Sequence, residues 1–328
     1  MKSIVSRILV LTAACSLLAG AAAARETEEF SAWLDALRVE ARAAGISQQT
    51  LAVALSGIEE PLSRVVDLDR KQPETTLSLQ AYVAGRVSEK RIAAGRRMLR
   101  RYPTWLGRVE RKYGVQRRFI VALWGLETNY GEHTGGIPVI QSLVTLAYDQ
   151  RRGAYFRREL LEALKILDAG HISPERMRGS WAGAMGQCQF MPSSFRRFAV
   201  DADGDGRVDL WSSVPDVLAS IANYLASSGW RDDQTWGRPV RLPKHFDSSR
   251  AGLEERLPLA RWQSLGVRRS DGRPLSRRQL EASLLVADGP EETAYLVYGN
   301  FRRILSWNRS DAFAVAVGTL ADRLAASR

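Results

Sequence analysis

The sequence has few of the residues that form disulfides and metal–histidine sites. It contains two cysteines and three histidines in 328 residues, and the histidines (His133, His171 and His245) lie far apart along the chain. No HExxH or CxxC spacing occurs, so a catalytic zinc site has no support. Cys188 is the one cysteine left once an N-terminal leader is removed, and we therefore expect no internal disulfide.

Long hydrophobic runs are absent after the first residues. The chain starts with Lys2 and Arg7, followed by an apolar run that begins at residue 8 and an alanine-rich end at Ala24. This order is typical of a secretory signal peptide, so we predict cleavage after residue 24 and a periplasmic protein. A membrane anchor is one alternative, although the run is shorter than the roughly 20 residues that a spanning helix needs. An outer-membrane lipoprotein modified at Cys15 is the other.

The charge is strongly positive, with a formal net charge of +11. Removal of the leader takes away two of these positive charges and no acidic residue. In an exported protein this excess favours an anionic polymer or surface as the partner. Nucleic acid is the other common partner of a basic protein, but export argues against it, and a solvated arginine surface that aids solubility is the simplest alternative.

The patterning predicts a mainly helical (α+β) protein. Phe30, Trp33, Leu34 and Leu37 recur at helical spacing, and five prolines mark a region of turns and short strands further along the chain. We expect the following segments: 1–24 signal peptide, 25–110 N-terminal helical domain, 111–230 catalytic core with an acidic loop, 231–290 small mixed subdomain, and 291–328 C-terminal helical part of the core.

Glu127 is the candidate acid/base. It follows Phe119, Ile120 and Leu123 at helical spacing, so its carboxyl belongs to the apolar face of a helix that ends near Gly131. Burial and the negative end of the helix dipole both disfavour the ionised carboxylate, which raises its pKa as a general acid near neutral pH requires. The alternative is a structural glutamate paired with a buried arginine.

A second catalytic carboxylate is hard to find in the sequence. Glycosidases usually place two carboxylates around the bond that they cleave. Glu132 and Asp149 are the nearest candidates, and neither shares the apolar face with Glu127. A mechanism with one carboxylate works if the substrate supplies its own nucleophile.

A glycine-rich segment at residues 179–195 combines small residues with polar and apolar side chains. Ser180, Gln187 and Gln189 offer hydrogen bonds, and residues such as Met185 offer apolar surface, a mixture that suits a sugar. Tight helix packing is the alternative reason for so many small residues.

The acidic segment at residues 201–209 resembles a calcium-binding loop of the EF-hand type. Its carboxylates occupy loop positions 1, 3, 5 and 9, and glycine occupies position 6. Position 12 is Ser212 instead of the usual glutamate, and Asp216 is the candidate replacement. The alternative is an acidic turn that binds no ion.

Together these motifs resemble the lytic murein transglycosylase B family, glycoside hydrolase family 103. The resemblance covers about residues 28–325, and the stretches that carry it are Ala81–Val83, Val87–Gly95, Ala122–Gly131, Gly179–Phe195, Asp209–Trp211, Ala222–Tyr224, Tyr298–Phe301 and Trp307–Ser310. It implies a lysozyme-like helical core with an added helical domain and a small mixed subdomain.

The resemblance also implies cleavage of the β-1,4 bond between N-acetylmuramic acid and N-acetylglucosamine in peptidoglycan, with formation of 1,6-anhydromuramyl ends. Glu127 would be the catalytic residue. No cofactor would be needed for the chemistry, and a structural Ca²⁺ would be held by Asp201, Asp203, Asp205, Arg207 (through its carbonyl) and Asp216. The substrate-binding residues would be Tyr82, Ser180, Met185, Gln189, Tyr224, Trp307, Asn308 and Phe313.

The chain departs from the family where Trp307 and Phe313 replace the usual tyrosines, so a hydroxyl contact to Glu127 or sugar is lost. Gln187 and Cys188 also stand where the family often has an aromatic residue and glycine. We expect a monomer that acts on peptidoglycan glycan strands, can associate with other cell-wall enzymes and does not bind nucleic acid. A hydrolytic muramidase and a non-catalytic peptidoglycan-binding protein are the alternatives.

Overall fold

The computed structural model describes residues 27–71, 77–149, 151–286 and 293–326. The predicted signal peptide, with Cys15, lies outside these residues. The described part is mostly helical with a small antiparallel sheet, which confirms the predicted fold class. It forms two compact units: the first contains residues 27–71, 135–185 and 190–196, and the second contains residues 77–134, 186–189 and 197–326.

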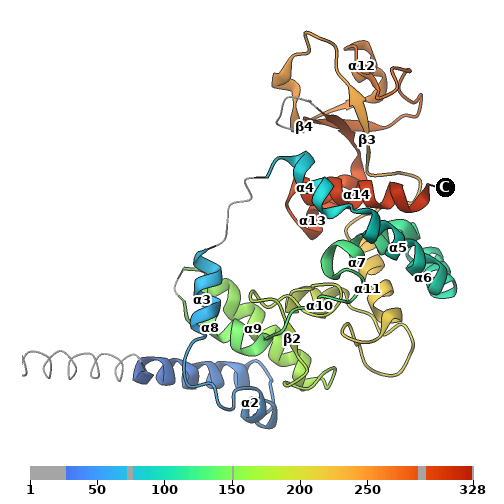
Figure 1. Cartoon of the computed structure of the whole chain (residues 1–328). Coiled ribbons are helices and arrows are strands. Elements are labelled where there is room, and N and C mark those ends of the chain that lie inside the picture. Colours follow the sequence, from blue (N-terminus) through green and yellow to red (C-terminus); the bar gives the residue numbers. More distant parts are fainter. Residues whose placement is uncertain (1–26, 72–76, 150, 287–292, 327–328) are drawn as a thin grey trace, which may run out of the picture. The chain divides into compact units, whose positions relative to one another are not determined.

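The first unit is mainly a set of helices (Figure 1) and buries apolar side chains between them. A helix over residues 27–43 buries Phe30, Leu34 and Leu37, as the spacing of these residues predicts. The ring of Phe30 meets that of Tyr148 edge-on, with 5.0 Å between centroids. The other elements of this unit are α2 (Gln48–Ala54), α3 (Ser63–Arg70), β1 (Ile137–Pro138), α8 (Val139–Tyr148), α9 (Gly153–Asp168), β2 (Arg178–Gly179) and α10 (Pro192–Phe198), whose last residues belong to the second unit.

The second unit combines a helical part with a sheet. Its helices are α4 (Leu79–Arg86), α5 (Glu89–Arg101), α6 (Pro103–Tyr113), α7 (Arg117–Thr128), α11 (Val214–Ser227), α12 (Leu259–Ser264), α13 (Gly299–Trp307) and α14 (Asp311–Ala325), with a 3-10 turn at Ser248–Arg250. Its strands are β3 (Gly237–Arg241), β4 (Gly252–Pro258), β5 (Arg268–Arg269), β6 (Glu281–Val286) and β7 (Ala294–Val297). Helix α7 packs against α5, α11 and α14, so it runs through the centre of the helical part.

The five strands form one antiparallel sheet in the order β4-β6-β7-β3-β5. Figure 1 shows this sheet and α12 at one end of the unit. The sheet has its own apolar core around Trp262, whose indole N–H donates to the carbonyl of Ala282 at 2.9 Å. Most of the sheet falls within the segment predicted to hold short strands.

The two units do not follow the predicted segment boundaries. Residues 77–110 belong to the second unit instead of joining residues 27–71, and residues 135–185 belong to the first. The predicted segment limits stay a prediction.

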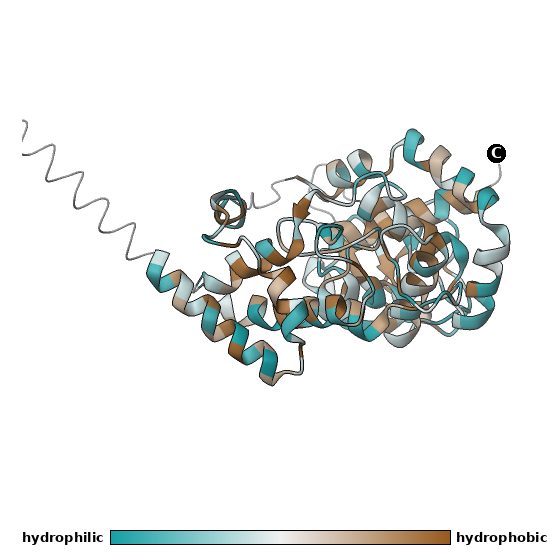
Figure 2. Cartoon of the chain, turned by 90° about the horizontal axis from the view of Figure 1, so that it is seen from below, coloured by the Kyte–Doolittle hydropathy of each residue, from teal (hydrophilic) through white to brown (hydrophobic). Residues whose placement is uncertain are grey.

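No helix in the described ranges is long and apolar enough to cross a membrane. The hydropathy colouring in Figure 2 agrees, because the helices carry hydrophilic and hydrophobic residues together.

Candidate active site

Helix α7 places Glu127 in its last turn. Residues 119–126 of this helix are buried, whereas Glu127 retains part of its exposure. The helix ends at Asn129, which adopts the left-handed conformation with φ of 51°. The sequence predicted both the helix and its end. The Glu127 carboxyl therefore lies at the edge of an apolar core.

Tyr130 fixes the position of this helix end. Its hydroxyl donates to the carbonyl of Arg91 on α5 at 2.9 Å, and its ring packs edge-on to that of Trp124. A Cβ added at Gly125 would lie 2.6 Å from the tyrosine hydroxyl oxygen, and one added at Gly95 would lie 2.5 Å from it. Both glycines are therefore required for α5 and α7 to close on the Tyr130 ring, which in turn fixes the start of the loop after Glu127.

Burial raises the pKa of Glu127 to about 7. Two neighbours act in the opposite direction and lower the pKa by a smaller amount. The indole Nε1 of Trp307 donates to Glu127 Oε1 at 2.7 Å, and the positive charge of Arg86 favours the ionised form. A carboxyl with this pKa is divided between its acid and base forms near neutral pH, as a group that must donate and then accept a proton requires.

Aromatic contacts hold Trp307 against Glu127. The rings of Trp307 and Tyr224 meet at 4.8 Å between centroids and 63° between planes. The Tyr224 hydroxyl donates to the carbonyl of Ser306 at 2.5 Å, and the centre of its ring lies 4.6 Å from that of Phe198. Tyr224 on α11 therefore fixes the end of α13 that carries the Trp307 hydrogen bond.

Gln187, which the sequence analysis offered as a hydrogen-bond partner for a sugar, makes its hydrogen bonds within the protein and is a positioning residue. Its side-chain oxygen accepts from Trp124 Nε1 at 2.9 Å, and its side-chain nitrogen donates to the carbonyl of Trp211 at 3.0 Å. Its backbone carbonyl accepts from the hydroxyl of Thr128, the neighbour of Glu127, at 2.9 Å. The loop at residues 186–189 is thereby tied to the last turn of α7.

Arg86 is a residue near Glu127 that the sequence analysis missed. It ends α4, and its guanidinium lies 5.4 Å from the centre of the Tyr82 ring. Tyr82, a predicted substrate contact, thus belongs to the same neighbourhood as the cation that lowers the pKa of Glu127. Because this proximity joins two helices, no local pattern in the sequence could have revealed it.

The other predicted substrate contacts are less direct. The Gln189 side-chain nitrogen donates to the carbonyls of Thr134 and Gly186, and the Asn308 side-chain oxygen accepts from Ser310 N. Phe313 is buried in the core of the second unit. Contact of these residues with a sugar stays a prediction.

Ser180 and Met185 belong to the first unit. The Ser180 hydroxyl accepts from Ala184 N at 3.0 Å, which closes a tight turn, and Met185 is fully buried. The structure therefore gives Met185 a packing role. The two alternative carboxylates also differ from Glu127: Glu132 is exposed and accepts from the Asn129 amide, and Asp149 belongs to the first unit, where it accepts from Arg151 N.

The acidic loop gathers three carboxylates. Asp201, Asp203 and Asp205 place one oxygen each within 4.8 Å of the others, a donor set that suits a hard cation such as Ca²⁺. Asp216 is buried beneath the loop, and its two oxygens accept from Ala202 N and Asp209 N at 2.8 Å each. Asp216 therefore fixes both ends of the loop, and its predicted role as a direct ligand stays a prediction.

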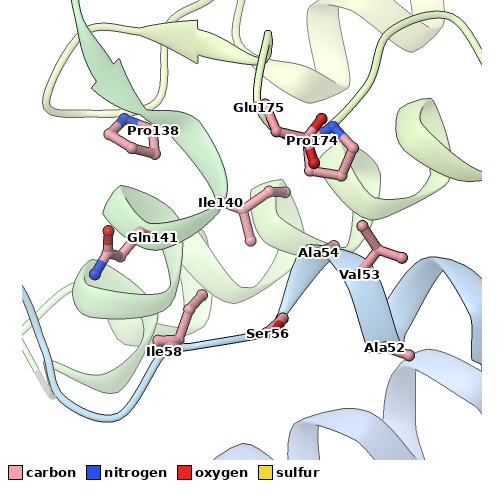
Figure 3. Close-up of a pocket in the computed structure, with 10 residues that line it drawn as sticks. All are labelled: Ala52, Val53, Ala54, Ser56, Ile58, Pro138, Ile140, Gln141, Pro174 and Glu175. Carbon is pink, nitrogen blue, oxygen red and sulfur yellow. The ribbon is translucent and has the colours of Figure 1, made fainter.

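A hollow of about 530 Å³ in the first unit offers a contrast (Figure 3). It is lined mainly by apolar side chains of α2, α8 and the loop before β2, and the carboxylate that lines it is that of Glu175. Glu175 is fully exposed, and hydrogen bonds from its own backbone and from Ser173 lower its pKa. A carboxylate of this kind is ionised at neutral pH and lacks the properties of a general acid.

Comparison with known proteins gives a family for this chain. The family described as transglycosylase SLT domain matches residues 29–322. The chain belongs to this transglycosylase family. A curated relative, membrane-bound lytic murein transglycosylase B of Escherichia coli, is 35% identical over 69% of this chain. The matched stretch spans 62% of the length of that relative.

Solved structures of transglycosylases show the same fold. SltB3 of Pseudomonas aeruginosa, in complex with NAG-anhNAM-pentapeptide, is 47% identical with a TM-score of 0.87, over 90% of this chain and 79% of that chain. The Escherichia coli lytic transglycosylase Slt35 in complex with calcium is 28% identical with a TM-score of 0.76, over 92% of each chain. These likenesses confirm the predicted lysozyme-like fold class.

Proposed function

We propose that the chain is a lytic transglycosylase that cleaves the β-1,4 bond between N-acetylmuramic acid and N-acetylglucosamine in peptidoglycan. The observation that carries the proposal is the Glu127 carboxyl, with a pKa of about 7 and one oxygen held by Trp307. The family membership and the relative bound to a NAG-anhNAM-pentapeptide support this substrate class.

The protonated Glu127 first gives its proton to the glycosidic oxygen. The bond between this oxygen and the muramyl C1 breaks, and N-acetylglucosamine leaves with a new 4-hydroxyl group. The muramyl acetamido group stabilises the positive charge at C1, and Glu127 is left as a carboxylate. The indole of Trp307 stabilises this ionised form through its hydrogen bond to Oε1, while Oε2 has no hydrogen-bond partner among the described residues.

The carboxylate then accepts the proton of the muramyl C6 hydroxyl. The C6 oxygen bonds to C1 and closes the 1,6-anhydro ring, and Glu127 returns to its acid form. No water enters the products. Because the C6 hydroxyl belongs to the same sugar as C1, its attack has a large proximity advantage over attack by free water.

We propose that the acidic loop binds Ca²⁺ as a structural ion. The ion would be bound by carboxylate oxygens of Asp201, Asp203 and Asp205 and by the carbonyl of Arg207. Asp216 would either be a further ligand or hold the loop in place through its hydrogen bonds to the backbone. The Slt35 structure with calcium supports this assignment. We also propose export through the N-terminal leader, with a periplasmic monomer that needs no cofactor for its chemistry.

Product analysis tests the reaction. Digestion of purified sacculi in water labelled with heavy oxygen should give muramyl ends that are lighter by one water than hydrolysed ends and that carry no label. A hydrolytic muramidase would incorporate the label into most new ends, and a non-catalytic binding protein would release no fragments. Either outcome would remove the transglycosylase assignment.

A further inference from the structure

A polar cavity of about 290 Å³ lies in the second unit, away from Glu127 in the sequence and not used by the proposed reaction. It is lined by residues of β4, of β6 and the two residues before it, of the end of β7 and of the first part of α13, together with residues 231 and 234. Four arginines line it: Arg231, Arg256, Arg302 and Arg303. Glu281 is the one acidic side chain among its lining residues, so positive charge predominates there.

The arginines of α13 differ in how they are held. Arg302 donates to the hydroxyl of Ser283 at 2.9 Å and to the carbonyl of Leu253. Burial lowers its pKa, the nearby charge of Arg256 lowers it further, and Glu254 acts in the opposite direction. Arg302 is thus a fixed cation in the wall of the cavity. Its partial burial beside Arg256 disfavours the charged form, and a bound negative charge would offset this free-energy cost.

Arg303 is the second arginine of α13 that lines the cavity. Its Nε has no hydrogen-bond partner among the described residues. The guanidinium lies over Gly229, where an added Cβ would be 3.4 Å from its Cζ. A buried N–H of a charged group that lacks a protein acceptor is expected to find one in water or in a ligand.

The start of α13 also borders the cavity. The residue before the helix, Tyr298, makes no side-chain capping hydrogen bond, and Gly299 lines the cavity. The N–H groups of an uncapped helix start attract negative charge. The buried side chain of Asn300 accepts from Arg231 N and donates to the carbonyls of Arg231 and Gln234, which holds this wall of the cavity in place.

We propose that this cavity binds an oxyanion, and that the oxyanion is a carboxylate of the peptide carried by the glycan strand. The assignment to the peptide rests on the proposed function. Helix α13 has nine residues, so Gly299 lies about 12 Å along the axis from Trp307, which contacts Glu127. An extended peptide of four or five residues spans roughly 13 to 18 Å, so a muramyl group near Glu127 can place a peptide carboxylate at this distance.

Calorimetry on the full mature chain tests the site without turnover. The probes are inorganic phosphate and the sugar-free stem peptide, each at low salt because exposed charges are screened. We expect both to bind, and the double variant Arg256→Gln with Arg303→Gln to weaken binding at least about tenfold through loss of charge-assisted hydrogen bonds. Arg277→Gln is the matched control, because Arg277 is exposed nearby in the sequence and does not line the cavity.

The outcomes separate the possible failures. Binding of phosphate without binding of the peptide would overturn the assignment to peptidoglycan peptides, and failure of both to bind would overturn the site. An equal loss in Arg277→Gln would show non-specific attraction and also overturn it. If the double variant melts at a lower temperature, the single variant Arg256→Gln replaces it in the test. Arg256 is exposed, so its replacement is not expected to destabilise the fold.

Turnover gives a second and independent readout. With peptide-bearing strands, KM should rise about tenfold in the double variant, whereas with strands stripped of peptide it should not change. An equal change on both substrates would contradict the proposal. If the unmodified protein forms no anhydro ends on either substrate, the proposed function fails, and the calorimetric result still decides whether the cavity binds an oxyanion.

Discussion

The second unit holds carboxylates in two contrasting environments, at Glu127 and in the acidic loop. Glu127 stands at the margin of an apolar core with one hydrogen-bond donor, so burial raises its pKa to about 7. Asp201, Asp203 and Asp205 are crowded together near solvent, with oxygens within 4.8 Å of one another. An isolated carboxyl suits proton transfer, whereas a cluster suits a cation, because mutual repulsion is relieved by bound positive charge.

Removal of the Glu127 carboxyl should produce the largest effect. Glu127→Gln keeps nearly the same volume but cannot donate or accept the proton, so turnover of peptidoglycan should fall by about 10²–10⁴. Release of soluble fragments from sacculi measures it. Glu132→Gln is the matched control, because this glutamate lies five residues away and is exposed, and its activity should remain close to that of the unmodified protein. Near-normal turnover in Glu127→Gln would sink the assignment of the acid.

Calcium should affect stability through the loop and leave Glu127 unaffected. Binding to the folded state raises the free energy of unfolding by about 2.7 kcal/mol when calcium is at about 100 times its Kd. The melting temperature should therefore be higher in calcium than in chelator, and Asp201→Ala or Asp205→Ala should abolish this difference. Asp35→Ala, an exposed aspartate of the first unit, should retain it. Identical melting curves with and without calcium would contradict a metal site.

The raised pKa of Glu127 should also make stability depend on pH. Its folded-state pKa of about 7 lies above the ordinary value of 4.5, so the folded state binds more protons between these values. Stability contributed by this group is then lost as pH rises from about 4.5 to 7. Glu127→Gln removes that loss, and its melting temperature should exceed that of the unmodified protein most clearly above pH 7. If the melting temperatures of the two proteins change with pH in the same way across this range, the result would argue against a raised pKa of Glu127.

Replacement of Trp307 should have the smallest of these effects, a shift in the pKa of Glu127. Its indole N–H lowers the pKa of Glu127, so Trp307→Phe should raise that pKa further. The acid form starts the reaction, and kcat/KM should therefore fall as pH rises through about 7 in the unmodified protein and at a higher pH in the variant. The pH profile of kcat/KM measures the shift. A fall at lower pH in Trp307→Phe would show that the indole does not stabilise the carboxylate.

The sequence was sufficient to predict the elements that depend on local pattern. The apolar stripe before Glu127 predicted α7, and the spacing of the aspartates predicted a loop that brings three of them together. Residues that act across the fold were not predictable in this way. Gln187 and Arg86 reach the Glu127 neighbourhood from a loop and from another helix, and neither stands at a spacing that relates it to α7.

The compact units were also beyond the reach of the sequence. Residues 135–185 fold with the N-terminal helices, and the following four residues return to the second unit. These limits are set by contacts between residues that are far apart in the sequence, which no local pattern reveals. Met185 shows the same limit on a smaller scale: an apolar side chain within a polar, glycine-rich segment looked available to a sugar, and the structure buries it.

The length of α13 has a geometric consequence. Each residue of an α-helix turns the chain by about 100°, so one residue inserted between Ile304 and Trp307 would rotate the indole away from Glu127 by more than a quarter of a turn. The aromatic contact with Tyr224 would be lost in the same step, because it meets the same ring. The number of residues in α13 therefore sets the direction in which its last side chain, Trp307, points.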